Sequence, residues 1–486
     1  MGVYASTDGY AIITAMQAYR TLQLWVLMAA AGCGSTLTAS VTVSKPADVE
    51  KLIPQETQKQ YAARISWWQE ARFGMFIHFG LYAMPARHEW VKNREFLDDG
   101  HYERYFKRFD PDRFDARDWA RRAKAAGMRY AVLTAKHHEG FCLFDSKFTD
   151  YKITNTPFGR DLVREFVDAF RAEGLRVGFY YSLLDWHHPD FTIDRCHPQR
   201  NLAKEKIAEM NACRDMARYR KYMKDQVTEL LTNYGKIDIV WFDFSYPGEN
   251  GKGRDDWDSA GLLSLARSLQ PGIIVDNRLD LNDCRGGVDF VTPEQVRVTA
   301  QPRFKGQPYA WEACHTLSGS WGYNRDEASW KSVVQCLDLL VSCVAHNGNL
   351  ILNVGPTARG TFDARAVARL DGLAKWMNDN SRAIYGCGEA PAGFTAPDGT
   401  QLTYNAKKNR LYVHLFAYPC SLLRMDFGDK VGYAQFLHDG SELQIRKMSE
   451  WECCHLGLAG GVRPIVVELP VVKPDVEVPV IELYLK

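Results

Sequence analysis

The sequence predicts a (β/α)8 TIM-like barrel followed by a C-terminal β-sandwich. From about residue 66 to 385, short apolar runs alternate with longer amphipathic segments, a pattern typical of strands and helices in a parallel sheet. Eight such runs match the strand number of a barrel. Beyond residue 386 the runs become short and alternating, as in "LTYNAKKNRLYVHLF" and "PIVVELP", which favours a sandwich.

The predicted barrel strands, in chain order, are residues 72–80, 129–138, 176–182, 238–244, 272–278, 289–294, 309–314 and 348–356. The predicted helices are residues 114–127, 160–174, 214–235, 259–270, 330–347 and 363–386. The first three helices end at Gly127, Gly174 and Gly235, because a left-handed glycine commonly closes a helix.

Composition excludes several classes of protein. The 486 residues are 46% hydrophobic and 24% charged, as in ordinary globular chains. The net charge of +1 provides no field to gather nucleic acid or anionic membrane, so we expect a neutral or modest-sized ligand. The 12 cysteines form no C-x-x-C pair, and Cys336 and Cys343 fit core positions of one helix, so neither a zinc site nor a disulfide framework is predicted.

The N-terminal segment has the pattern of an export signal. In "YRTLQLWVLMAAAGCGSTLTAS", Arg20 precedes an apolar stretch, residues 22–31, that is too short to span a bilayer. The following Cys33 resembles the acylated cysteine of a bacterial lipoprotein, and Met16 is then the more natural start. The alternative is simple cleavage near Ala31. We expect an exported protein, either secreted, periplasmic or anchored to the outer membrane through a lipid on Cys33.

The domain boundaries follow from these patterns. We assign residues 1–45 to the signal and tether, 46–386 to the barrel and 387–486 to the sandwich.

Polar residues lie at the C-terminal ends of the apolar runs of the predicted barrel. Active sites of such barrels lie at the carboxyl ends of the strands, so residues at these positions are candidates for chemistry. Asp243 is conspicuous, because "KIDIVWFDF" surrounds it with apolar side chains and a buried carboxylate requires a charged or hydrogen-bonding partner. The other strand-end candidates are His78, His137, His138, Tyr180, Tyr181, Arg278 and Glu294.

Several chemistries lack support. Adjacent strand residues such as His137 and His138 point to opposite faces unless the chain bends, and no H-E-x-x-H spacing occurs, so no metal site is predicted. His187 and His188 are expected at the surface or rim. No G-x-S-x-G elbow, Walker loop or Rossmann fingerprint is present, and we expect no cofactor. The carboxylates Asp243 and Glu294 remain, and such a pair suits glycoside hydrolysis.

The sequence resembles the α-L-fucosidases of glycoside hydrolase family 29 over roughly residues 60–390. The motifs that carry this resemblance are "EARFGMFIHFGLY", "HEW", "AKHHEGFCLFDSKFTDY", "GRDLVREFVDAFRAEGLRVGFYYSLLDW", "DIVWFDF", "DFVTPEQ", "SWGY" and "NGNLILNVGPTARG". The resemblance implies a retaining mechanism acting on a small-molecule or oligosaccharide substrate that ends in fucose. It also implies a C-terminal β-sandwich.

The resemblance assigns roles by position. Asp243 is the implied nucleophile, and Glu294 is the implied general acid/base, with Glu312 in "AWEAC" as the rival. The implied sugar-binding residues are His78, Glu89, Trp90, His137, His138, Tyr180 (with Tyr181 as the alternative), Arg278 and Trp321. Phe244 departs from the family, in which a small residue often follows the nucleophile.

Two further functions stay open from the sequence. One is a glycan-binding lipoprotein without turnover, and the second is an exo-glycosidase acting on α-L-galactosides, since packing around one methyl group discriminates by only about 1–3 kcal/mol. For a retaining enzyme we expect carboxyl groups about 5–5.5 Å apart. We also expect a donor such as Arg278 or an imidazole to keep the pKa of Asp243 low. Linkage preference is expected to depend on the loops at 186–200 and 244–258.

Overall fold

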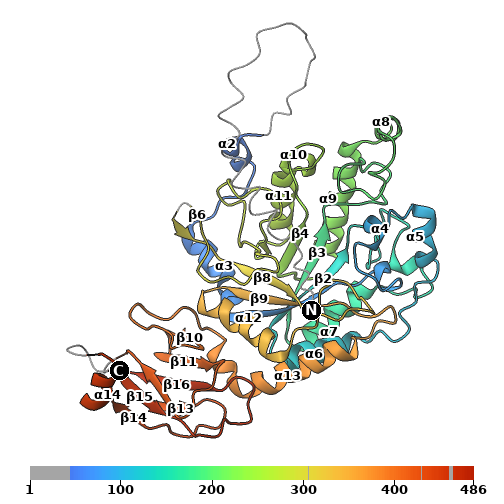
Figure 1. Cartoon of the computed structure of the whole chain (residues 1–486). Coiled ribbons are helices and arrows are strands. Elements are labelled where there is room, and N and C mark those ends of the chain that lie inside the picture. The colour runs from blue at the N-terminus through green and yellow to red at the C-terminus, as the bar shows by residue number, and fades with distance from the viewer. Residues whose placement is uncertain (1–43, 305, 428–429, 459–463) are drawn as a thin grey trace. The chain divides into compact units, whose positions relative to one another are not determined.

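The computed structural model describes residues 44–304, 306–427, 430–458 and 464–486. The predicted signal, with Met16 and Cys33, lies outside the described residues. Residues 44–486 form one compact unit (Figure 1). Across the described chain, no helix combines the length and apolar character that a bilayer crossing demands.

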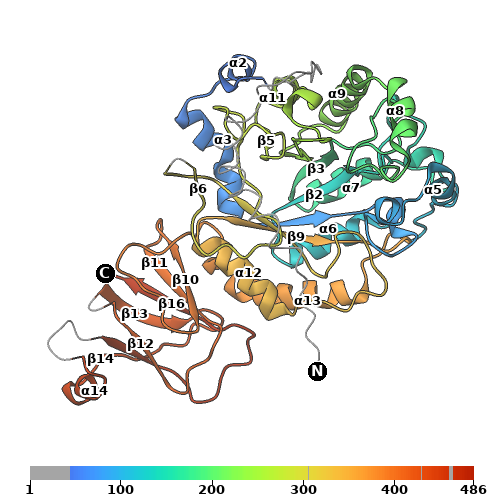
Figure 2. The same cartoon turned by 45° about the horizontal axis from the view of Figure 1, so that its top comes forward.

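The larger part of this unit is built on a curved parallel sheet. Among the described residues, seven strands follow the order β5-β4-β3-β2-β1-β9-β8. Helices surround the sheet (Figure 2). The strands are β1 (Phe73–Ile77), β2 (Tyr130–Lys136), β3 (Arg176–Ser182), β4 (Ile239–Asp243), β5 (Ile274–Val275), β8 (Glu312–Thr316) and β9 (Asn349–Val354). Seven of the eight predicted strands are therefore confirmed.

Residues 289–295 occupy the remaining position between β5 and β8, but they form no regular strand. Backbone bonds of 2.9–3.0 Å link this segment to β8 and the residues just before it. On the β5 side, Asp289 N donates to Val275 O at 3.1 Å. Thr292 N donates to the side-chain oxygen of Asn277 in place of a backbone bond. The predicted strand at 289–294 is therefore wrong in detail, because Pro293 has no N–H to extend a ladder.

Helices connect the strands, and their ends follow local sequence. The longer ones are α3 (Gln58–Ala71), α6 (Ala116–Ala125), α7 (Leu162–Ala172), α9 (Met216–Thr232), α11 (Ser259–Leu269), α12 (Val333–Ala345) and α13 (Ala364–Asn380). Side chains of Asp115 and Asp161 accept hydrogen bonds from the first turns of α6 and α7, as N-caps do. Gly127, Gly174 and Gly235 take φ values of 85°, 76° and 71°, which confirms the predicted helix ends.

Shorter elements lie in the connections. They are α2 (Pro46–Glu50), η2 (Leu81–Ala83), α4 (Val91–Arg94), α5 (Asp99–Phe106), η3 (Ile153–Asn155), α8 (Lys204–Ala212), α10 (Arg254–Trp257), β6 (Arg303–Phe304), β7 (Gln307–Pro308) and η4 (Ser381–Ala383).

The barrel strands alternate between two apolar cores. In β1, Phe76 belongs to a cluster with Tyr180 and Trp241 from β3 and β4, whereas Met75 and Ile77 pack in the core shared with the outer helices. This alternation follows from the two-residue period of a strand. It sends every second side chain into the barrel, toward the site described below.

The C-terminal residues form two antiparallel sheets, which confirms the predicted sandwich. In the described part, one sheet has the order β10-β11-β16-β13 and the other the order β12-β15-β14. Leu411, Val413, Leu423, Val467 and Leu483 fill the space between them. The elements are β10 (Thr400–Asn405), β11 (Arg410–Leu415), β12 (Leu422–Met425), β13 (Val431–Phe436), β14 (Ile445–Lys447), α14 (Glu450–His455), β15 (Ile465–Glu468) and β16 (Val480–Leu485).

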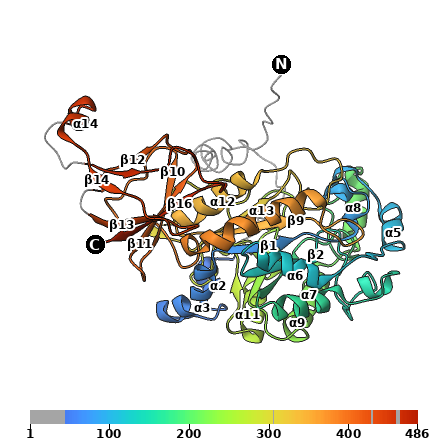
Figure 3. The ribbon, with the colours of Figure 1, turned by 90° about the horizontal axis from the view of Figure 1, so that it is seen from below.

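The sandwich packs against α12 and α13 of the barrel (Figure 3). Trp376 Nε1 on α13 donates to Val478 O at 2.8 Å, and Thr403 Oγ1 donates to Ala383 O at 2.7 Å. The predicted boundary at 386/387 falls between η4 and β10 and stays a prediction.

Candidate active site

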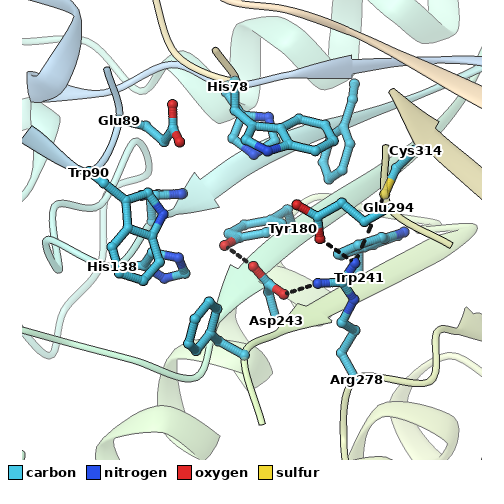
Figure 4. Close-up of a pocket in the computed structure, with 14 residues that line it drawn as sticks. His78, Glu89, Trp90, His138, Tyr180, Trp241, Asp243, Arg278, Glu294 and Cys314 are labelled. Atoms are coloured by element: carbon cyan, nitrogen blue, oxygen red, sulfur yellow. Dashed lines mark hydrogen bonds and ion pairs between the residues drawn. The ribbon is translucent and has the colours of Figure 1, made fainter. Parts of the chain in front are cut away.

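A pocket of about 390 Å³ opens at the carboxyl ends of the barrel strands. All ten residues predicted for the site line it (Figure 4). They are His78, Glu89, Trp90, His137, His138, Tyr180, Asp243, Arg278, Glu294 and Trp321. Convergence at one edge of the sheet explains this, since each residue lies in the C-terminal half of a strand or in the connection after it.

Asp243 is the last residue of β4 and is only 8% exposed. The Tyr180 hydroxyl donates to its Oδ2 at 2.7 Å, and Arg278 Nη1 lies 3.1 Å from its Oδ1. Burial raises the pKa of Asp243 above its ordinary value, against the opposing effects of Arg278 and Tyr180. The predicted donor is therefore present, but the expectation of a low pKa is wrong, because burial outweighs the donors.

Glu294 shares the same arginine. Arg278 Nη2 lies 2.8 Å from Glu294 Oε2, so one guanidinium bridges both carboxylates (Figure 4). Burial alone would lower the pKa of Arg278, but Asp243 and Glu294 raise it above its ordinary value. The Glu294 side chain is 42% exposed, in contrast to the buried Asp243. The site therefore combines one enclosed carboxylate with one that solvent reaches.

Arg278 is held in place independently of the carboxylates. Its Nε donates to Thr292 Oγ1 at 3.0 Å, and its guanidinium lies 4.8 Å from the centre of a Trp241 ring. The bridge is thus fixed by the barrel wall as well as by the acids it joins.

Two buried histidines have their tautomers set by neighbours. His78 Nδ1 lies 2.6 Å from Asn353 Oδ1, and Asn353 Nδ2 donates to Trp321 O, which fixes the amide orientation. His138 Nδ1 lies 2.7 Å from Ser182 Oγ, whose own proton goes to Leu184 O. Burial holds the pKa of both imidazoles well below the ordinary range. Both rings are therefore neutral and keep Nε2 as an acceptor.

His137 faces a carboxylate that sequence reasoning did not single out. Glu139 is 1% exposed, and its Oε2 lies 3.3 Å from His137 Nδ1. Its position, two residues after His137 in "KHHEGF", was visible in the sequence, but its burial beside the imidazole was not.

Glu89 and Trp90 enter from the connection after β1. Glu89 Oε2 accepts hydrogen bonds from Gly322 N at 2.9 Å and Ser320 Oγ at 3.2 Å. It thereby anchors the loop that carries Trp321. The Trp90 ring lies 5.0 Å from that of His138.

Glu312 lies below the pocket and does not belong to its lining. It is fully buried and accepts from Trp68 Nε1 at 3.2 Å, from Trp241 Nε1 at 3.4 Å and from the Tyr130 hydroxyl. Burial raises its pKa to about 7. This geometry is that of a structural carboxylate joining strands, and it favours Glu294 over Glu312 at the site.

Tyr181 and His187 lie away from the pocket. The Tyr181 hydroxyl donates to Gln226 Oε1 on α9 at 2.8 Å, on the helix side of the sheet, whereas Tyr180 faces the barrel interior. His187 stacks on Tyr151 with ring centroids 3.9 Å apart and is absent from the pocket lining.

Sequence reasoning left four lining residues out of the predicted site, namely Phe76, Trp241, Phe244 and Cys314. The two-residue strand period could have found Phe76 and Trp241, which precede His78 and Asp243 by two positions. No such pattern in the sequence identifies Cys314 as a lining residue. No group of three or more His, Cys, Asp or Glu side chains suited to a metal ion occurs within the residues described.

Comparisons with known proteins agree with this architecture. The family model for α-L-fucosidase matches residues 39–382, so the chain belongs to that family. An α-L-fucosidase isoenzyme from Paenibacillus thiaminolyticus is similar with a TM-score of 0.80 and 42% identity, covering 88% of this chain and 100% of that one. Human plasma α-L-fucosidase is 30% identical over 349 residues, which are 66% of this chain and 69% of the relative.

One similar solved structure contains a reaction intermediate. It is a family 29 α-L-fucosidase from Bacteroides thetaiotaomicron trapped as a covalent intermediate with 2-fluoro-fucosyl fluoride. It is similar to this chain with a TM-score of 0.73 and 28% identity, covering 89% of this chain and 97% of that one.

Proposed function

We propose that this protein is an exo-acting, retaining α-L-fucosidase that hydrolyses terminal α-L-fucose from glycans by double displacement. The observation that carries the proposal is the pair Asp243 and Glu294, held by one Arg278 guanidinium in a pocket at the strand ends. Family membership and the covalent intermediate trapped in a relative support the same reaction class.

The difference in exposure supports the division of roles. Asp243 is enclosed and fixed by two donors, which suits a nucleophile that must meet C1 of the sugar in one geometry. Glu294 is exposed at the opening, where a leaving group departs and water enters. It therefore suits the general acid and base.

The reaction then runs in two steps. An Asp243 oxygen attacks C1 while Glu294 transfers its proton to the departing glycosidic oxygen, so an ester forms as the C1–O bond breaks. Glu294, now a carboxylate, takes a proton from water, which attacks C1 and releases Asp243 with retained configuration. One of the two acids is anionic at each stage, so Arg278 faces one negative charge throughout.

The remaining lining groups suit a neutral sugar. The Nε2 atoms of His78 and His138 can accept hydrogen bonds from hydroxyl groups, because each Nδ1 is already engaged. Trp321 and Phe76, with ring centroids 6.0 Å apart, present apolar surface for the C6 methyl group of fucose. This surface favours fucosides over α-L-galactosides by about 1–3 kcal/mol.

The test is hydrolysis of an aryl α-L-fucoside followed by NMR, which should detect α-L-fucose as the first product. Asp243→Ala should abolish release while the protein keeps its thermal unfolding transition. Near-normal turnover by folded Asp243→Ala, or β-L-fucose as the first product, would overturn the proposal. Fucose binding without any turnover by the wild type would indicate a binding protein instead.

Export and lipid attachment at Cys33 are part of the proposal and are supported by the apolar stretch before that cysteine. In a bacterial host, the full chain should incorporate labelled palmitate and sediment with membranes. Cys33→Ser should do neither. Secretion of an unlabelled wild-type protein would instead support cleavage near Ala31.

A further inference from the structure

The pocket has a closed floor and a partly exposed mouth. Its floor is buried and includes Asp243, Tyr180 and the histidines. The lining residues that keep exposed surface are Trp90, Phe244, Arg278, Glu294 and Trp321. A leaving group bonded to C1 of a sugar in the pocket has to emerge through this mouth, which is partly aromatic.

Phe244 has an unusual backbone conformation directly beside the reacting carboxylate. Its φ is +86°, a left-handed value that bulky L-residues rarely adopt. Strain of this kind persists where the surroundings impose it and marks functional sites.

The phenyl ring of Phe244 is fixed by rings around it. Its centroid lies 5.3 Å from Trp90, 5.1 Å from His138 and 5.3 Å from Tyr246, with interplanar angles of 49°, 71° and 65°. These edge-on and tilted contacts are the preferred arrangements of aromatic pairs. The ring is therefore positioned before any ligand arrives.

The loop that carries Phe244 is fastened to the loop after β3. The Tyr246 hydroxyl donates to Asp194, and Lys252, 4% exposed, forms an ion pair with the same carboxylate. Tyr246 N also donates to Lys252 O at 2.8 Å. Arg195 Nη1 donates to Glu249 O at 2.9 Å. The mouth is thus a preformed surface, which lowers the cost of ordering on binding.

We propose that Phe244, supported by Trp90, is a platform for the sugar next to fucose, namely a hexopyranose that packs its C–H face on the phenyl ring. This inference rests on the proposed function. The next ring is joined to C1 through the glycosidic oxygen, and the leaving group departs from the side of C1 opposite to Asp243. The next ring therefore lies at the mouth, through which the leaving group emerges. Of the two phenylalanines adjacent to Asp243 in the chain, Phe242 is buried, whereas Phe244 lines the pocket and keeps exposed surface at the mouth.

The test compares two leaving groups on Phe244→Leu. α-L-Fucosyl fluoride has a single-atom leaving group and cannot use the platform, so its kcat/KM should stay within about threefold of wild type. A fucosyl disaccharide ending in galactose or N-acetylglucosamine should lose about tenfold or more. Phe244→Tyr keeps the ring and should keep disaccharide activity. Phe394→Leu, the same change at a half-buried ring of the sandwich, should alter neither substrate.

Equal loss of kcat/KM on both substrates would overturn the inference, since Phe244 would then serve fucose or the nucleophile. Unchanged kcat/KM on both substrates would also overturn it. If Phe244→Leu fails to fold, the wild type supplies the measurement. With fucosyl fluoride as donor, a methyl β-hexopyranoside should accept fucose at lower concentration than methanol, and equal efficiency overturns the platform. A wild type inactive on every fucoside would refute the proposed function instead.

Discussion

At the scale of single residues, Arg278 determines how the two acids work together. It contacts Asp243 through Nη1 and Glu294 through Nη2. An unpaired buried carboxylate resists ionisation, and the cation opposes that tendency at Asp243.

Replacing Arg278 should therefore change the pH dependence of the reaction. Asp243 must be ionised to attack, and its pKa is already raised by burial against the effect of Arg278. In Arg278→Gln that opposing charge is lost, so the pKa rises further and the acidic limb of kcat/KM moves to higher pH. The profile is measured with fucosyl fluoride, which needs no proton from Glu294. Arg278→Lys, which keeps the charge, should shift the limb less.

An acidic limb that stays in place in Arg278→Gln would show that the guanidinium does not act on the nucleophile.

The loss of rate when Glu294 is replaced should be larger for leaving groups that need a proton than for activated ones. Glu294→Ala should lower the first-step rate on natural disaccharides by about 10²–10⁴-fold but spare substrates with activated leaving groups. Rapid-mixing kinetics with a dinitrophenyl fucoside should show a burst, and azide should accelerate the slow second step. If Glu312→Ala shows this pattern and Glu294→Ala does not, the two roles are exchanged.

At the scale of elements, the buried carboxylate of Glu312 joins strands of the barrel interior. It opens β8 and accepts from Tyr130 on β2 and Trp241 on β4. Burial makes the charged form of such a group costly, and here it outweighs the three donors, which favour the carboxylate.

Glu312 should accordingly make stability depend on pH. Its folded pKa, about 7, is raised from an ordinary 4.5. The favourable contribution is complete below about pH 4.5 and is lost as pH rises through 7, with a total near 3 kcal/mol. Glu312→Gln, which stays neutral, should flatten this part of the curve of unfolding free energy against pH. Equal curves for the two proteins would contradict a raised pKa.

The sequence predicted helices and strands well where the signals for them lie close together in the chain. Alternation and terminal glycines gave seven barrel strands and the ends of α6, α7 and α9, because these signals lie within a few residues. The same strand-end logic brought Asp243, Arg278 and Glu294 into one pocket.

What the sequence could not supply depends on tertiary contacts. The irregular closure at 289–295 relies on two side chains: Asp289 accepts from Val275 N on β5, and Asn277 accepts from Thr292 N. The raised pKa of Asp243 is a balance between burial and two donors, and composition says nothing of that balance. The position of the Phe244 ring depends on contacts with rings from three separate connections.

At the scale of the whole molecule, the sandwich supports the barrel from outside. Tyr412, Val478 and Val480 belong to the same apolar cluster as α12 and α13. Removing the sandwich would expose that surface to water.

Replacing Trp376 tests whether the contact between sandwich and barrel stabilises the protein. Trp376→Phe keeps a ring but leaves Val478 O unpaired, so the free energy of unfolding should fall by about 1–3 kcal/mol. Its kcat/KM should be unchanged, because Trp376 lies outside the pocket lining. Trp451→Phe, at a site 69% exposed, is the control and should be neutral. Unchanged stability in Trp376→Phe would mean that this bond does not hold the two parts together.

The most direct measurement for the whole account is identification of the residue that carries the sugar. Wild-type protein treated with 2-deoxy-2-fluoro-α-L-fucosyl fluoride should accumulate a fluorofucosyl ester. Peptide mass spectrometry should place this ester on Asp243 in "IVWFDF". An ester on another carboxylate, or release of fluorofucose with inverted configuration and no ester, would contradict the account.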